Sequence, residues 1–167
     1  MYINNVIFNP CKPTSVGNIQ ISSTDPLLPP KIYSNYLDTE YDKKMMIEGI
    51  RLIRRIANAP ALNSIIKDEL APGDRIKSAN DIAKYIRQKA WSVFHPCSTC
   101  RMGNNPNISV VDPKLRVHGV DNLRVVDASI FPTIPTGNIN APSIMVGEYA
   151  SDIILKDAKN RKGLSCT

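Results

Sequence analysis

Four segments of the chain carry apolar residues at every third or fourth position, which is the spacing of a helix that packs one face on a core. The most regular segment is 42–58, with the apolar residues Met46, Ile50, Ile53 and Ala57. We expect this helix to end before Pro60, because proline cannot continue a helix. The other three predicted helices cover residues 62–69, 78–90 and 140–156.

Capping residues mark the starts of the last two predicted helices. Ser78 is followed three residues later by Asp81, a pairing in which each side chain can bond to the backbone of the other residue. Asn140 is suited to cap the final helix, and Pro142 fits its first turn, where a missing N–H costs nothing. These signals favour the helical interpretation of both segments.

Two segments have the pattern of strands. In 16–22, Ile19 and Ile21 face one way and their polar neighbours the other, which predicts a half-buried antiparallel strand. The run 123–127 is short, contains two valines, and precedes a loop rich in proline. Helices and strands in this order predict an α+β fold.

Charge and hydropathy exclude several classes of partner. The chain has a formal net charge of +6, from 21 lysines and arginines against 15 acidic residues, but the basic residues are scattered. We therefore expect a solvated surface and no nucleic-acid partner. No apolar run reaches the roughly 18 to 20 residues of a membrane-spanning helix, so we expect no transmembrane segment. We predict a cytoplasmic location, with any targeting signal in a missing N-terminal part.

Two histidines are candidates for acid–base chemistry. His95 lies in a loop after a predicted helix, among proline and small residues that can present a side chain into a cleft. His118 lies next to a turn glycine, Gly119. From residue type and position alone, a structural role is the simpler interpretation of each histidine.

Cys97 and Cys100 form a C-x-x-C motif, whose spacing suits a zinc site or a redox pair. Together with His95 and His118, they offer a set of four zinc ligands. The chain has no second C-x-x-C motif, and no thioredoxin-like pattern precedes this one. Buried, unreactive thiols are the simpler interpretation, and a zinc site stays open as an alternative.

The glycines and acidic residues bear on ligand binding. No two of the eight glycines are separated by a single residue, so the glycine-rich motif that binds dinucleotides is missing from this chain. Asp127 lies where a predicted strand meets a turn of small residues, as many ligand-contacting acids do. It is therefore a candidate ligand-binding residue.

The most specific motif of the chain is HPCSTCRMG over 95–103. The segments 111–120, 123–130, 137–142 and 147–148 follow it, and 17–22 and 25–30 precede it. In their order and spacing, these motifs resemble the C-terminal region of the glucose-methanol-choline oxidoreductases, especially the choline-dehydrogenase-like branch. The resemblance spans about residues 8–156.

The resemblance implies a flavoprotein that oxidises a primary alcohol, choline-like or other, to an aldehyde with FAD as cofactor. In this family hydride passes from the carbinol carbon to flavin N5 while a base removes the hydroxyl proton. The matching motif implies that His95 is the base, and an imidazole, with an ordinary pKa of about 6.5, can accept a proton near pH 7. The family's second catalytic position, His or Asn, corresponds to Asn138, whose amide can donate a hydrogen bond to the substrate oxygen but cannot take its proton.

Cofactor contacts and domains are implied in the same way. Asp127 and Ala128 match the segment near the flavin linker, and Asn138 and Ile139 match the segment beside the ring. The start of the final helix would stabilise the reduced flavin through its dipole. The implied organisation is an antiparallel substrate-binding sheet with flanking helices over 1–106, a strand and helix over 107–157 that complete a Rossmann-like FAD-binding domain, and a polar tail over 158–167.

The family's N-terminal half, which carries the dinucleotide-binding motif, has no counterpart in this sequence. We therefore expect the chain to need that missing half as a partner, with a small alcohol as substrate. Two alternatives from other functional classes stay open. One is a small zinc-binding module built on Cys97 and Cys100, and the other is a module that binds a partner without flavin chemistry.

Overall fold

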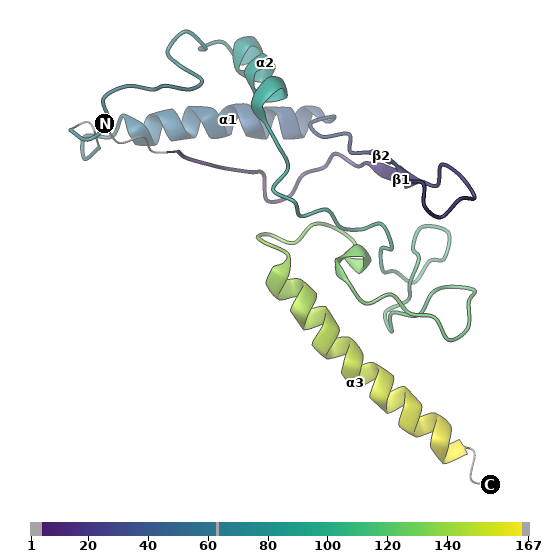
Figure 1. The fold of residues 1–167 in the computed structure, drawn as a ribbon. Helices are drawn as coiled ribbons and strands as arrows, with labels where there is room; N and C mark the ends of the chain where they lie inside the picture. The colour runs from purple at the N-terminus through teal and green to yellow at the C-terminus, as the bar shows by residue number, and fades with distance from the viewer. Residues whose placement is uncertain (1–4, 63, 165–167) are drawn as a thin grey trace. The chain divides into compact units, whose positions relative to one another are not determined.

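The computed structural model describes residues 5–62 and 64–164. In chain order they form the strands β1 (Asn18–Gln20) and β2 (Lys31–Tyr33), the helices α1 (Glu40–Ala57) and α2 (Ala79–Lys89), the short 3-10 helix η1 (Ala128–Ile130) and the long helix α3 (Asn140–Leu164) (Figure 1). The chain divides into two compact units, Met1–Ser92 and Val93–Thr167. Helices with a small antiparallel sheet agree with the predicted α+β class.

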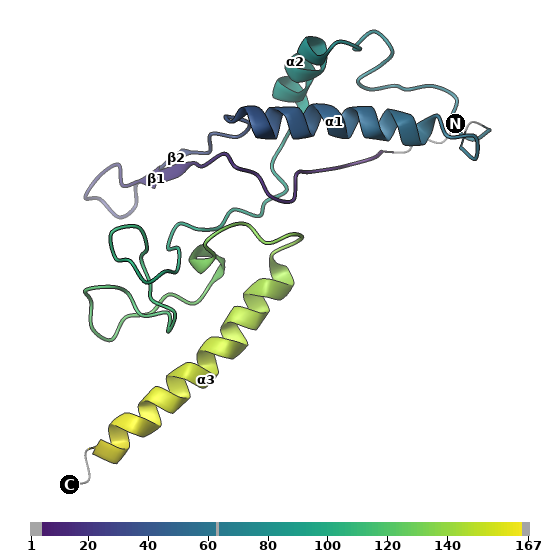
Figure 2. The same ribbon diagram turned by 180° about the vertical axis from the view of Figure 1, so that it is seen from behind.

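The first unit contains a short hairpin, which Figure 2 shows from behind. β1 and β2 pair antiparallel, with Ile19 opposite Ile32. A Cβ on Gly17 would lie 2.2 Å from the carbonyl oxygen of Tyr33, so this close approach requires glycine. The strand predicted over 16–22 is confirmed as antiparallel, but it is shorter and its residues are exposed rather than half-buried. Pairing stops at Lys31 because the preceding residue, a proline, has no N–H to donate.

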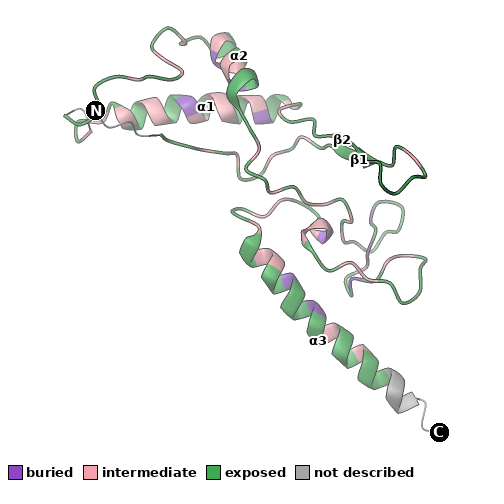
Figure 3. Cartoon of the chain, viewed as in Figure 1, coloured by how far each residue is buried: buried purple, intermediate pink, exposed green. Residues whose placement is uncertain are grey.

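Helices α1 and α2 confirm the predictions over 42–58 and 78–90. The Thr39 side chain caps α1 by accepting from the Asp42 N–H at 3.2 Å, and the Ser78 side chain caps α2 by accepting from the Asp81 N–H at 3.1 Å. The two helices pack around Ile50, Ile82 and Ile86, which are buried in this unit (Figure 3). Each helix is thus fixed by a cap and by one apolar face.

The prediction of a helix over 62–69 is wrong. The described residues of this range form turns and irregular backbone, and Ile65 is 72% exposed. A short helix needs a core against which its apolar face can pack, and none covers this segment. Glu69 instead pairs with Arg54 of α1, with 2.9 Å between carboxylate Oε2 and Nε.

Asp42 is a buried carboxylate that fastens the start of the chain to α1. It is 1% exposed and accepts hydrogen bonds from the backbone N–H groups of Thr14 and Ser15, both at 2.8 Å, and from both hydroxyls. Burial raises the pKa of Asp42, but the hydrogen bonds from Ser15 and Thr14 outweigh it, so the net pKa lies below the ordinary value of 3.8. The carboxylate is therefore charged when it holds this segment.

Replacing Asp42 by alanine should weaken the attachment of residues 14 and 15 by about 2 to 4 kcal/mol, because their N–H and hydroxyl donors lose a buried, charged acceptor. Hydrogen exchange at these two amides should accelerate about 30-fold or more at pH 7 in the full-length protein. Since the folded pKa is depressed, this stabilisation is complete above pH 3.8 and is lost as the pH falls through the lower folded pKa. The difference between parent and variant should therefore shrink below about pH 4.

Asp68→Ala serves as the matched control, because this carboxylate is exposed in an irregular segment of the same unit. It should leave exchange at residues 14 and 15 unchanged. Equal exchange rates in the parent and in Asp42→Ala at pH 7 would contradict the anchoring role.

In the second unit, a loop-rich segment packs on α3. The buried core consists of Val111, Leu115, Ile130, Val146 and Ala150. The strand predicted over 123–127 is reduced to an isolated bridge between Arg116 and Arg124. The range bonds to the preceding segment from the Val117 N–H to the Leu123 oxygen and from the Val125 N–H to the Leu115 oxygen.

Helix α3 begins where the sequence predicted and ends later. Asn140 is its first residue rather than its cap, since the Ser143 N–H bonds to the Ile139 carbonyl at 2.9 Å. The helix continues past residue 156 to Leu164, so 158–164 of the predicted polar tail is helical. The Arg124 guanidinium pairs with Asp157 of α3 and ties the loop segment to it. Within the described residues, no helix is sufficiently long and apolar to cross a membrane.

Candidate functional site

His95 lies in a tight loop at the start of the second unit. The residue before it, Phe94, has a φ of 61°, and Ser98 has a φ of 76°. Both residues carry a side chain and lie in the left-handed region, which costs about 1 kcal/mol or more for each. Such a conformation persists only where the surrounding structure imposes it. His95 itself is half-buried. The backbone of this loop is therefore held in a conformation that presents His95 at a bend.

Backbone hydrogen bonds join the 95–103 loop to η1. The Cys100 N–H donates to the Ser129 carbonyl at 3.0 Å, and the Met102 N–H donates to the Ile130 carbonyl at 2.8 Å. Two motifs far apart in the sequence thus meet in one unit. This pairing connects the His95 motif directly with the segment that begins at Asp127.

Asp127 and Ala128 form the start of η1. The Asp127 carboxylate accepts the Ser129 N–H at 2.7 Å and so caps the short helix. Ala128 is half-buried behind it, whereas Asp127 is exposed. The Ser129 hydroxyl is a buried side-chain polar atom with no hydrogen-bond partner among the described residues. Sequence reasoning gave this serine no role, although it lies within the 123–130 motif.

Asn138 and Ile139 directly precede α3. Asn138 is exposed and Ile139 is half-buried. Gly137 has a φ of 124°, a conformation that glycine adopts far more readily than other residues. It lies in the bend before the helix. Within residues 5–62 and 64–164, no hydrogen bond joins His95 to Asn138. Both residues belong to the second unit.

The N-terminus of α3 suits an anionic or electron-rich group. Its first turn contains no acidic residue. Pro142 has no N–H and the Ser143 N–H is bonded to the Ile139 carbonyl, so the N–H groups of Asn140 and Ala141 are the ones that lie at the start of the helix. A long helix carries a partial positive charge at that end. Together with the unpartnered Ser129 hydroxyl, this feature fits a cofactor with polar edges.

The cysteines do not form a metal centre with the histidines. In the described part of the chain, no three His, Cys, Asp or Glu side chains are close enough to hold a metal ion. Cys97 Sγ lies 3.2 Å from the Ser98 hydroxyl, and both Cys97 and Cys100 are free thiols. His118 contacts the Gly103 carbonyl and the Ser109 hydroxyl instead. The zinc-binding alternative thus gains no geometric support.

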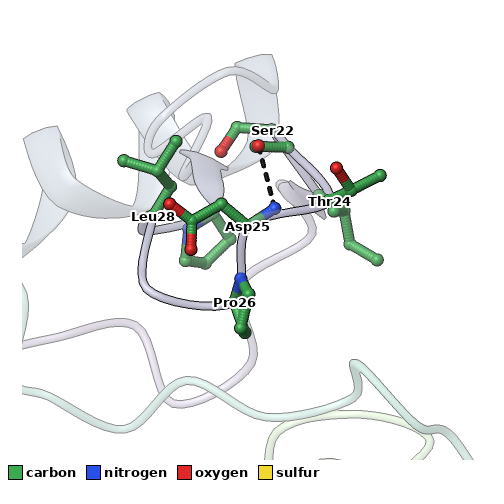
Figure 4. Close-up of a pocket in the computed structure, with 8 residues that line it drawn as sticks. Ser22, Thr24, Asp25, Pro26 and Leu28 are labelled. Atoms are coloured by element: carbon green, nitrogen blue, oxygen red, sulfur yellow. Dashed lines mark hydrogen bonds between the residues drawn. The ribbon is translucent and has the colours of Figure 1, made fainter.

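A shallow hollow lies on the loop between β1 and β2 (Figure 4). The polar groups of the loop serve its own turn, since the Asp25 N–H donates to the Ser23 hydroxyl at 3.0 Å and the Asp25 carboxylate accepts the Leu27 N–H at 3.0 Å. This hollow carries none of the residues that the sequence singled out for chemistry. It is therefore not the candidate site.

Comparisons with known proteins bear on this site. A family model described as GMC oxidoreductase, for the C-terminal region, matches residues 13–147. The chain is 44% identical over 147 residues to an oxygen-dependent choline dehydrogenase of Vibrio vulnificus (strain YJ016), covering 87% of this chain and 26% of that protein. It is 46% identical over 144 residues to an alcohol dehydrogenase [acceptor] of Pseudomonas putida, covering 86% of this chain and 26% of that protein.

The fold is also similar to that of a solved structure. An FAD-dependent oxidoreductase from Chaetomium thermophilum superposes with a TM-score of 0.84 at 31% identity, covering 89% of this chain and 26% of that chain. The chain thus spans about a quarter of the length of each relative that it matches. The matched region contains every candidate residue named above.

Proposed function

This chain belongs to the GMC oxidoreductase family, and from that membership we propose that it is the C-terminal part of an FAD-dependent enzyme that oxidises a primary alcohol to an aldehyde. The relatives include a choline dehydrogenase and an alcohol dehydrogenase. A choline-like or other small alcohol is accordingly the proposed substrate. The chain spans about a quarter of the length of these relatives, and the proposed activity is that of a full-length protein built like them.

The observation that carries the proposal is the pairing of the His95 loop with η1. Bonds from the Cys100 and Met102 N–H groups to Ser129 and Ile130 unite the proposed base and the proposed cofactor segment in one unit. A general base needs to be held within reach of a substrate that lies against its cofactor. A zinc module or a simple partner-binding module gives no reason for this arrangement.

We assign the proton transfer to His95. A neutral imidazole can accept the hydroxyl proton of the alcohol, and the bent loop holds the His95 side chain half-buried. Asn138 would donate an amide hydrogen bond to the same oxygen as negative charge develops on it. Since an amide does not accept a proton at neutral pH, the base role belongs to His95 alone.

Four residues are proposed to contact FAD: Asp127, Ala128, Asn138 and Ile139. The buried, unpartnered Ser129 hydroxyl and the acid-free N-terminus of α3 support a polar cofactor in this place. When bound, FAD accepts the hydride that leaves the carbinol carbon. We propose accordingly that 107–157 completes an FAD-binding domain and that 1–106 belongs to the substrate-binding region.

The remaining part of the full-length enzyme is the proposed partner. The relatives extend far beyond the matched region, and α3 exposes Ile144 at 61%, Met145 at 56% and Tyr149 at 61%. An apolar surface of this kind is costly in water unless another part of the protein covers it. These residues therefore support a packing partner on α3.

Spectroscopy of the purified full-length protein tests the proposed function. We expect flavin absorbance, which should bleach under anaerobic conditions when a primary alcohol such as choline or benzyl alcohol is added. A ketone, which has no hydrogen on its carbonyl carbon, should not bleach it. A folded full-length protein without flavin, or with flavin that no alcohol reduces, would contradict the proposal.

A further inference from the structure

His118 is the second histidine of the chain, and the proposed reaction does not use it. Its Nε2 atom lies 3.0 Å from the Gly103 carbonyl oxygen and 3.2 Å from the Ser109 hydroxyl. Ser109 is 9% exposed, and its hydroxyl lies 2.6 Å from the Asn105 carbonyl. The His118 ring and the Ser109 hydroxyl thus bond to two backbone carbonyls of the 103–109 turn.

The direction of these hydrogen bonds follows from their acceptors. A carbonyl oxygen can only accept, so Nε2 of His118 carries a hydrogen and donates it to Gly103. The Ser109 hydroxyl has one proton, and its oxygen lies 2.6 Å from the Asn105 carbonyl and 3.1 Å from the Gly103 carbonyl. The shorter distance directs this proton to Asn105, so the Ser109 oxygen can accept a share of the Nε2–H that His118 donates to Gly103. His118 therefore acts as an N–H donor.

Gly103 is the end of the loop that carries His95. Its N–H donates to the Val111 carbonyl at 2.9 Å, and the preceding N–H, of Met102, donates to Ile130 of η1. A Cβ on Gly103 would lie 3.0 Å from the Ser109 Cβ, so the turn packs tightly against the glycine. The Gly103 carbonyl lies in the peptide that follows these bonds, so fixing it restrains the end of the segment that bonds to η1.

We propose that His118 is a positioning residue: its Nε2–H holds Gly103 and thereby keeps the 95–103 loop in register with η1, so that His95 reaches the substrate. The inference rests on the proposed function for its effect on catalysis. The effect on loop structure is independent of that function.

Two amide variants of the full-length protein form a matched test. Glutamine places its amide nitrogen close to the position of imidazole Nε2, whereas asparagine is one carbon too short to reach Gly103. His118→Asn should accelerate hydrogen exchange at Cys100, Met102 and Gly103 about 5- to 10-fold, the effect of one lost hydrogen bond. His118→Gln should restore the parent rate. The Thr14 and Ser15 amides serve as a control and should not change in either variant.

Kinetics provide the second measurement. A displacement of the base lowers kcat, and we expect a loss of about 10- to 100-fold in His118→Asn with KM and flavin content unchanged. His118→Gln should recover most of kcat. If His118→Asn does not accumulate as folded protein, His118→Leu, which keeps the bulk of the side chain but has no N–H donor, is measured in its place with the same direction of change.

The outcomes separate the two proposals. Unchanged exchange at 100–103 in His118→Asn, or equal exchange in both amide variants, overturns the positioning role. Faster exchange with unchanged kcat also overturns it, because His118 would then be structural only. A parent protein whose flavin no alcohol reduces overturns the proposed function, while the exchange measurement still decides whether His118 orders the loop.

Discussion

Full-length protein with His95→Gln should retain its flavin and oxidise its alcohol about 10² to 10⁴ times more slowly than the parent. Glutamine approximates the size of the imidazole and can still donate a hydrogen bond, but it cannot take the hydroxyl proton. The loop conformation depends on Phe94 and Ser98 and on the bonds to η1 rather than on the imidazole itself. The loss should therefore appear in the rate of flavin reduction, measured by anaerobic stopped-flow absorbance.

A variant outside the proposed machinery gives this prediction its control. Asn104→Ala, at an exposed residue just after the loop, should keep the parental rate of flavin reduction. A His95→Gln variant that reduces flavin at the parental rate would falsify the assignment of the base.

The sequence predicted those elements whose local signals agree with their packing. Segment 78–90 has both a capping residue and an apolar face, and segment 42–58 has the most regular apolar face. Both fold as predicted, with Ile50, Ile82 and Ile86 in the core. Segment 62–69 has the helical spacing alone, and without a surface to pack on it forms turns. Periodicity is thus informative where tertiary contacts agree with it.

The geometry of the candidate site depends on contacts that no local pattern contains. The 95–103 motif identified His95, but its pairing with η1 consists of backbone bonds between residues about thirty positions apart. Ser129 became notable only through the burial of its hydroxyl. In the same way, His118 could be interpreted as structural or catalytic until its bond to the Gly103 carbonyl was seen. Long-range hydrogen bonds, rather than residue types, distinguish these roles.

Asn138→Ala should lower kcat by about 10² to 10³, because a hydrogen-bond donor aimed at a developing negative charge contributes mainly in the transition state. KM should change little, since the neutral alcohol oxygen of the ground state gains less from the same donor. Asn138→His restores a ring N–H donor and, as the other residue type found at this family position, should recover much of the activity. Steady-state kinetics with the alcohol that reduces the flavin measures all three proteins.

Combining the two substitutions tests whether His95 and Asn138 act on the same oxygen. If both stabilise one transition state, the double variant His95→Gln/Asn138→Ala should be far less impaired than the product of the single losses, because each group works only when the other is present. Among the described residues no hydrogen bond joins His95 to Asn138, so strong coupling would point to a substrate shared by the two side chains. Fully additive losses would show that Asn138 acts elsewhere, and a loss in KM rather than in kcat would identify it as a binding residue only.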